Sequence, residues 1–160
     1  MALHTISMPA PGDAFPLLRG HRTRLRAPHP DDAGPLAALL PDAAGYLAEC
    51  GGFLARGDRI DWIVTTHRDD TAIGTCTLHG IDMRARCAEI GYALVPDARG
   101  HGFATDAAGR AIAWARQALD LRRIDAHADP SNLASQRVLA RLHFVAEAPD
   151  RYCLSCSGST

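Results

Sequence analysis

A glycine-containing stretch between a strand-like and a helical pattern, residues 96–105, has the composition of a phosphate-binding loop. Gly100 and Gly102 allow the backbone to turn sharply and to approach a ligand without an intervening Cβ atom. The helix expected to follow directs free backbone N–H groups and the positive end of its dipole back into the loop. From these residues alone, a phosphate or pyrophosphate site and a glycine-rich helix start without a ligand both remain open.

Two common nucleotide-binding loops do not fit this stretch. All 17 basic residues are arginine, so the chain lacks a Walker-type phosphate lysine and any lysine for Schiff-base chemistry. The dinucleotide-binding fingerprint needs a third Gly or Ala three residues after Gly102, where this chain has Thr105. That fingerprint also follows the first strand of a parallel sheet, whereas antiparallel strands are expected to precede this loop.

The thiols and imidazoles show no metal-binding or redox pattern. The five cysteines are odd in number and irregularly spaced, which suits a reducing compartment better than a disulfide framework. Cys153 and Cys156 form a C-x-x-C, but a zinc site needs a second pair, and a redox pair usually opens a helix. None of the eight histidines has a metal-ligand spacing. We therefore expect two unrelated thiols and no metal.

The hydrophobic patterns predict the elements that must position the loop. In the expected strand 59–66, Ile60, Trp62 and Val64 share one face. The order of the elements predicts an α/β fold, or an α+β fold with one β-α-β unit at its centre. Strands are expected over residues 22–26, 59–66, 71–81, 88–95, 123–128, 144–146 and 152–155, and helices over 31–40, 42–56, 103–119 and 129–142.

Length and composition set the organisation of the chain. Its 160 residues favour one domain, which we expect over residues 18–156, with a flexible N-terminal arm over 1–17 and a tail over 157–160. The net charge of -1 argues against nucleic acid or an acidic membrane as partner. No apolar run of about 18 residues and no signal-peptide pattern occurs, so we expect no membrane span and a cytoplasmic location.

Taken together, the motifs resemble those of the GNAT superfamily, the acyl-CoA-dependent N-acetyltransferases. Residues 99–104, Arg-x-x-Gly-x-Ala, fit the superfamily's Arg/Gln-x-x-Gly-x-Gly/Ala loop. Residues 89–96, Glu-Ile-Gly-Tyr-Ala-Leu-Val-Pro, and 132–144, which begin Asn-x-x-Ser, resemble the Rim-type branch. That branch acetylates protein N-termini, chiefly of ribosomal proteins, and some small amines. Residues 24–33 also fit, so the resemblance covers residues 18–155.

The resemblance implies a fold and an activity. The fold would be a mixed, mostly antiparallel twisted sheet of about six to seven strands, flanked by about four helices, with a central β-α-β unit for the cofactor. Residues 18–156 would form a single acyl-CoA N-acyltransferase domain. The activity would be transfer of an acetyl group from acetyl-CoA to an amine by direct attack, in a monomer or homodimer. A non-catalytic acyl-CoA-binding sensor or interaction module is the alternative.

The resemblance also implies the residues that hold the cofactor. Backbone amides of residues 100–105 would hold the CoA pyrophosphate. Leu94 and Val95 would pair their backbone with pantetheine and polarise the thioester carbonyl. Asn132 would bond to the pantetheine arm, or would only cap its own helix. The full set of cofactor-binding residues implied is Leu94, Val95, Arg99, Gly100, His101, Gly102, Phe103, Ala104, Thr105 and Asn132.

Two residues are the catalytic candidates by resemblance. Glu89 would take the proton of the attacking amine, because the superfamily often places a carboxylate base on this strand. A surface or ion-paired carboxylate is the alternative for Glu89. Many members carry a tyrosine seven residues after the Asn, where this chain has Leu139, so Ser135 is the candidate acid or hydrogen-bond donor to the sulfur. A helix-stabilising serine is the alternative for Ser135. The acceptor would be a protein α-amine or a small amine.

Overall fold

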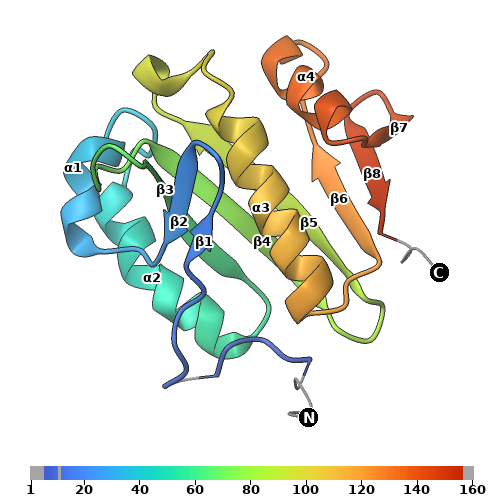
Figure 1. The fold of residues 1–160 in the computed structure, drawn as a ribbon, viewed down its shortest axis with the longest axis horizontal. Coiled ribbons are helices and arrows are strands. Elements are labelled where there is room, and N and C mark those ends of the chain that lie inside the picture. The colour runs from blue at the N-terminus through green and yellow to red at the C-terminus, as the bar shows by residue number, and fades with distance from the viewer. Residues whose placement is uncertain (1–5, 11, 157–160) are drawn as a thin grey trace.

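The computed structural model describes residues 6–10 and 12–156. Eight strands form one sheet in the order β1-β2-β3-β4-β5-β6-β8-β7, and every neighbouring pair is antiparallel except β5 and β6 (Figure 1). The elements are β1 Leu18–Arg19, β2 Thr23–Arg26, η1 Pro30–Asp32, α1 Ala33–Leu36, α2 Ala43–Arg56, β3 Ile60–Thr66, β4 Gly74–Asp82, β5 Cys87–Leu94, η2 Pro96–Ala98, α3 Phe103–Ala118, β6 Arg123–His127, α4 Leu133–Arg141, β7 Val145–Ala148 and β8 Arg151–Ser155.

The predicted fold class is confirmed. The described chain is a mixed, mostly antiparallel sheet with four α-helices, and β5, α3 and β6 form the expected central β-α-β unit. The sheet has one strand more than the upper limit of the prediction. That strand, β1, is only two residues long and is too short to leave a periodic pattern in the sequence.

The first helix is much shorter than predicted. In place of a helix over 31–40, the chain forms a 3₁₀ turn and the single turn of α1. Gly34 has a low helix propensity, costing about 1 kcal/mol relative to alanine. Pro41 disfavours helical geometry at Leu40, so the segment ends in turns.

The sheet is apolar on both faces, and each face is covered by different helices. Ile60, Trp62 and Val64 pack in the main core with α3, as the alternation predicts. Ile63 points the other way, into a smaller cluster with Leu36 and Ala43 beside α1 and α2. The small side chains on the inner face of α3 let this helix lie close across the sheet; they are Ala107, Ala108, Ala111 and Ala115.

The end of the predicted N-terminal arm contacts the core. The indole N–H of Trp62 donates to the Pro16 carbonyl at 2.9 Å, and Phe15 meets the Trp62 ring edge-on at a centroid distance of 6.4 Å. Residues 1–5 and 11 of the arm, and the tail 157–160, lie outside the described residues. Within the described ranges, no helix is long and apolar enough to cross a membrane.

Candidate functional site

A cavity of about 590 Å³ lies at the carboxyl end of β5, between the loop that precedes α3 and the first turns of α4. Three of its side chains, Arg99, Arg137 and Arg141, are positively charged. The full lining is Tyr92, Ala93, Leu94, Arg99, Gly100, Gly102, Phe103, Ala104, Thr105, Asn132, Ala134, Ser135, Arg137, Val138 and Arg141. The predicted loop and the predicted Asn-x-x-Ser helix therefore meet at one site.

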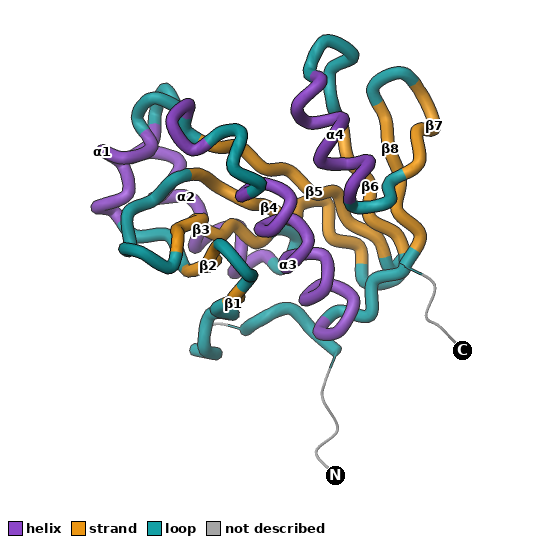
Figure 2. Tube along the Cα trace, turned by 45° about the horizontal axis from the view of Figure 1, so that its top comes forward, coloured by secondary structure: helices purple, strands orange, loops and turns teal. Residues whose placement is uncertain are grey.

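The cavity exists because β6 stops pairing with β5 before β5 ends. Residues 87–90 pair with 123–126, and no residue of β6 pairs with 91–94. The Val95 N–H donates to the Ile73 carbonyl on the β4 side, at 2.9 Å. The backbone N–H and C=O groups of successive residues in a strand point alternately to its two edges. Since Val95 points toward β4, the backbone groups of Leu94 and Tyr92 point to the other edge of β5, into the gap left by β6. Figure 2 shows the two strands separating below α4.

The loop presents a row of free backbone donors to this opening. Gly100 and Gly102 both have left-handed backbones, with φ of 80° and 78°, which explains the two glycines. The first bond of α3 runs from the Asp106 N–H to the Gly102 carbonyl. Across residues 6–10 and 12–156, the backbone N–H groups of residues 100–105 make no hydrogen bond within the chain. Such a row at a helix start fits a phosphate group.

Asp106 and Arg22 brace the loop from outside the cavity. The Asp106 carboxylate accepts the N–H groups of residues 21–23 and the Thr23 hydroxyl, which ties the turn after β1 to the first turn of α3. Burial alone would raise the pKa of Asp106, but the hydrogen bonds from Thr23 and the backbone outweigh it and hold this pKa below its ordinary value. Arg22 Nη1 donates to the His101 carbonyl at 2.8 Å.

The first turn of α4 forms the opposite wall. Asn132 is the N-cap, and its Oδ1 accepts the Ser135 N–H at 3.1 Å, so the capping role considered for Asn132 is confirmed. Asn132 also lines the cavity, where its amide NH₂ group can still donate. Ser135 Oγ lies 2.9 Å from the Tyr92 hydroxyl, which joins the two walls across the opening.

Three predicted residues lie outside the cavity lining. The polar backbone groups of Val95 are both bonded within the chain, to the Ile73 carbonyl and the Ala98 N–H. The His101 ring stacks on Phe103 at a centroid distance of 5.5 Å. Glu89 is the third residue, and it lies on a different face of the sheet.

Glu89 sits between two histidines on neighbouring strands. Its neighbours Ala88 and Ile90 pack in the main core against α3, so the alternation of the strand turns Glu89 to the other face. One carboxylate oxygen lies 3.6 Å from His79 Nε2, and the other lies 3.9 Å from His127 Nε2. About a third of the Glu89 side chain, 33%, is exposed.

Three polar side chains of the cavity were not predicted from the sequence; they are Tyr92, Arg137 and Arg141. Arg137 and Arg141 are four residues apart on α4, a spacing that places both on one helix face and could have been read from the sequence. Tyr92 lies two residues before Leu94 on the same strand, so both side chains point to the same face, and Leu94 was among the predicted site residues. Its partner on α4 depends on how the helix crosses the sheet, and the sequence pattern carries no signal for that.

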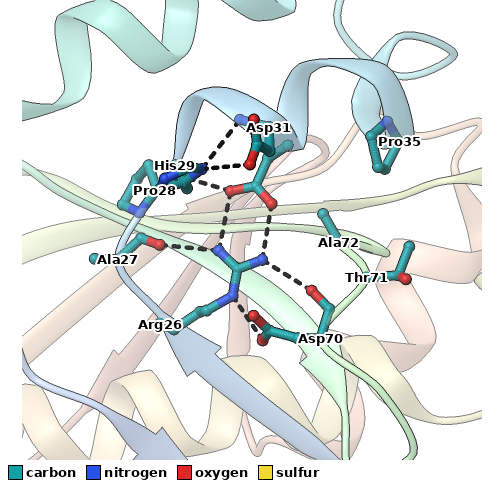
Figure 3. A pocket seen from close by; sticks show the side chains of 10 residues that line it. Arg26, Ala27, Pro28, His29, Asp31, Pro35, Asp70, Thr71 and Ala72 are labelled. Atoms are coloured by element: carbon teal, nitrogen blue, oxygen red, sulfur yellow. Dashed lines mark hydrogen bonds and ion pairs between the residues drawn. The ribbon is translucent and has the colours of Figure 1, made fainter.

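The early motif over residues 24–33 holds the fold together at a second cavity of about 700 Å³ (Figure 3). Arg26 donates to both carboxylate oxygens of Asp32, at 2.7 and 2.9 Å, and to Asp70 at 2.8 Å. Burial would raise the pKa of Asp32, but the hydrogen bonds from Arg26 and the His29 N–H hold it below its ordinary value. This cluster ties β2 to η1 and to the connection between β3 and β4.

The five cysteines are free thiols. Cys153 and Cys156 are both buried, and burial is the main cause that raises the pKa of each thiol. A raised pKa keeps a thiol protonated and unreactive near neutral pH.

Comparison with known proteins agrees with this geometry. Residues 22–145 match the family model described as the acetyltransferase (GNAT) domain. The chain is 31% identical over 100 residues to the uncharacterized N-acetyltransferase YoaA of Bacillus subtilis (62% of this chain, 56% of YoaA). It is 40% identical over 78 residues to the uncharacterized N-acetyltransferase p20 of Bacillus licheniformis (49% of this chain, 44% of p20). The chain thus spans about half the length of these curated relatives.

Solved structures share the fold at low sequence identity. The ribosomal-protein-S5-alanine acetyltransferase of Vibrio fischeri superposes with a TM-score of 0.75 at 19% identity, covering 89% of this chain and 98% of that one. RimJ of Mycobacterium smegmatis, in complex with CoA-disulfide, gives a TM-score of 0.72 at 20% identity, covering 88% and 86%. With the family model matching most of its length, the chain belongs to the GNAT acetyltransferase family.

Proposed function

We propose that this chain transfers an acetyl group from acetyl-CoA to an amine. The observation that carries the proposal is the row of free N–H groups of residues 100–105 at the start of α3, beside an open strand edge. Main-chain donors and a helix dipole suffice to bind a pyrophosphate, so the absence of lysine is no obstacle. Arg99, Arg137 and Arg141 add positive charge around the same cavity.

The free edge of β5 supports a position for the pantetheine arm. Tyr92 and Leu94 direct their peptide groups into the opening, and an amide-containing chain laid along this edge would meet them as another strand does. Arg99 Nε already donates to the Leu94 carbonyl at 3.1 Å, which leaves the Leu94 N–H as the donor for the thioester carbonyl. Val95 cannot pair with pantetheine in this way, because its backbone N–H and C=O groups both make hydrogen bonds within the chain.

Glu89 remains our candidate base, on the other face of the sheet. It pairs with Asp125, one residue before the β5–β6 pairing ends at Ile90, so it lies at the inner end of the opening. An amine that reaches the thioester from this face would meet the Glu89 carboxylate, while the sulfur would face Tyr92 and Ser135 on the opposite side. The alternative, in which Glu89 is only an ion-paired carboxylate, is supported by the nearby His79 and His127.

The acceptor we propose is a protein N-terminal α-amine or a small amine. Structural neighbours named for acetylation of ribosomal proteins, such as the S5-alanine enzyme and RimL in complex with CoA, support the Rim-type branch. A cytoplasmic location and a monomer or homodimer stay predictions.

The test is a screen of amine acceptors with acetyl-CoA and detection of the released CoA thiol. Peptides beginning with Ala, Ser or Met and a panel of small amines would be compared with N-acetylated versions of the same peptides. We expect thiol release that requires a free amine. Tight binding of acetyl-CoA without amine-dependent release, for every acceptor, would favour the non-catalytic CoA-binding module instead.

A further inference from the structure

Two hydroxyl groups from different elements meet inside the cavity. Tyr92 comes from the free end of β5 and Ser135 from the first turn of α4, and their oxygens lie 2.9 Å apart. Their contact joins β5 to α4, which form opposite walls of the cavity. Among residues 6–10 and 12–156, no other phenol lines this cavity.

Tyr92 is also the best proton donor in the cavity by acidity. Of the lining side chains that the structure describes, three carry a hydroxyl group: Tyr92, Thr105 and Ser135. A phenol has an ordinary pKa of about 10, close to about 8.5 for a thiol, whereas the alcohols of serine and threonine are far weaker acids. A departing thiolate would therefore take its proton most readily from Tyr92.

We propose that Tyr92 gives its proton to the CoA thiolate as it leaves, and that Ser135 positions the phenol for this step. The proposal rests on the function proposed above. The amine nitrogen forms the C–N bond to the acetyl carbon, and the C–S bond breaks with its electron pair going to sulfur. The sulfur takes the phenol proton. The proton lost by the amine, taken up by Glu89 or water, restores the phenol through solvent, so atoms and charges balance.

The neighbourhood of the pair fits these two roles. The Asn132 side chain accepts the backbone N–H of Ser135. This hydrogen bond fixes the backbone position from which the Ser135 hydroxyl extends. The Tyr92 hydroxyl also donates to the Ser135 backbone carbonyl, over a long distance of 3.4 Å. If the Ser135 hydroxyl donates to the Tyr92 oxygen, only this long, weak hydrogen bond has to break before the phenol proton can pass to the sulfur. Burial is the main cause that raises the pKa of Tyr92, so the phenol carries its proton at neutral pH.

The first experiment compares Tyr92→Phe with Tyr152→Phe, a matched control on β8 outside the cavity. We expect Tyr92→Phe to lower turnover about 10- to 100-fold, with acetyl-CoA affinity within about twofold of wild type and a nearly unchanged melting temperature. Tyr152→Phe should keep wild-type turnover. Wild-type turnover in a folded Tyr92→Phe protein would overturn the proposal.

A second experiment tests the contact with sulfur without relying on turnover. Calorimetry would compare CoA with desulfo-CoA, which lacks the thiol, at a pH above about 8.5, where the free thiol ionises. We expect wild type and Tyr152→Phe to prefer CoA, and Tyr92→Phe to lose about tenfold of that preference. An unchanged preference would overturn the proposal. A wild type that shows the preference but acetylates no amine would overturn the proposed function and leave only the contact between Tyr92 and the sulfur.

A third comparison separates the donor from the positioning residue. Ser135→Ala should lose less turnover than Tyr92→Phe, Ser135→Thr should restore much of it, and the double variant should be no slower than Tyr92→Phe alone. A larger loss in Ser135→Ala than in Tyr92→Phe would mean that the serine itself donates the proton, and the proposal would be wrong.

Discussion

Replacing Gly102 by alanine separates ligand binding from backbone strain, because the chain contains a matched glycine. Gly102, the N-cap of α3, has φ +78°, and Gly57, the C-cap of α2, has φ +76°. A Cβ atom at Gly57 would have no neighbour within 4 Å, and one at Gly102 would meet only Arg22 Nη1, at 3.8 Å. Both alanine variants therefore carry the same left-handed strain and no clash inside the protein.

The expected magnitudes follow from this match. Left-handed geometry costs alanine about 1 kcal/mol relative to glycine, which lowers the melting temperature of a chain of this size by about 2–4 °C. We expect that shift in both variants. Only the methyl group at Gly102 would stand among the free N–H groups of the loop. Loss of one hydrogen bond to a charged phosphate weakens binding by about 1.5 kcal/mol, which raises the Kd slightly more than tenfold.

The assay is calorimetric titration of acetyl-CoA into the three proteins, with melting curves recorded on the same samples. We expect Gly102→Ala to bind at least about tenfold more weakly than wild type, and Gly57→Ala to bind as wild type does. Equal affinity in all three proteins, together with the common shift in melting temperature, would refute the assignment of this loop to the pyrophosphate.

Three further predictions concern side chains. Glu89→Gln should lower turnover by about 100-fold and leave acetyl-CoA affinity unchanged, with Glu147→Gln as control; full turnover would move the base elsewhere. Arg137→Gln should weaken acetyl-CoA binding several-fold at low ionic strength, and calorimetry should show a smaller loss at high salt. Asp32→Asn should lower the free energy of unfolding by about 3 kcal/mol at neutral pH. Because the pKa of Asp32 is held low in the folded protein, this difference should shrink in urea titrations below about pH 4, where Asp32 of the unfolded wild-type chain gains a proton before the folded carboxyl does.

The glycine-containing loop before α3 was predictable from sequence because its geometry restricts residue type. Left-handed backbones at Gly100 and Gly102 favour glycine, and the helix after them follows from a periodic run of alanines. The Asn132 cap was predictable for the same reason, since a side-chain acceptor is needed where a helix starts.

The parts that sequence analysis missed depend on tertiary geometry. Glu89 and Tyr92 are three residues apart on one strand, so they face opposite sides of the sheet, but the sequence does not say which side holds the cavity. The contact between Tyr92 and Ser135 joins residues 43 positions apart. The short first helix illustrates the opposite failure, because the helix expected over residues 31–40 did not take the low helix propensity of Gly34 into account.

The early separation of β5 from β6 also predicts that the parts of the sheet on its two sides open as separate cooperative units. Only residues 87–90 and 123–126 form the ladder between the larger part of the sheet and the smaller part, β6, β8 and β7, which carries α4 (Figure 2). Hydrogen exchange should therefore find that β6, β7, β8 and α4 open together, at a lower free energy than the β3–β5 core. A ligand that bridges the loop and α4 would contact both units, so acetyl-CoA should slow exchange throughout the smaller one, including amides far from the cavity.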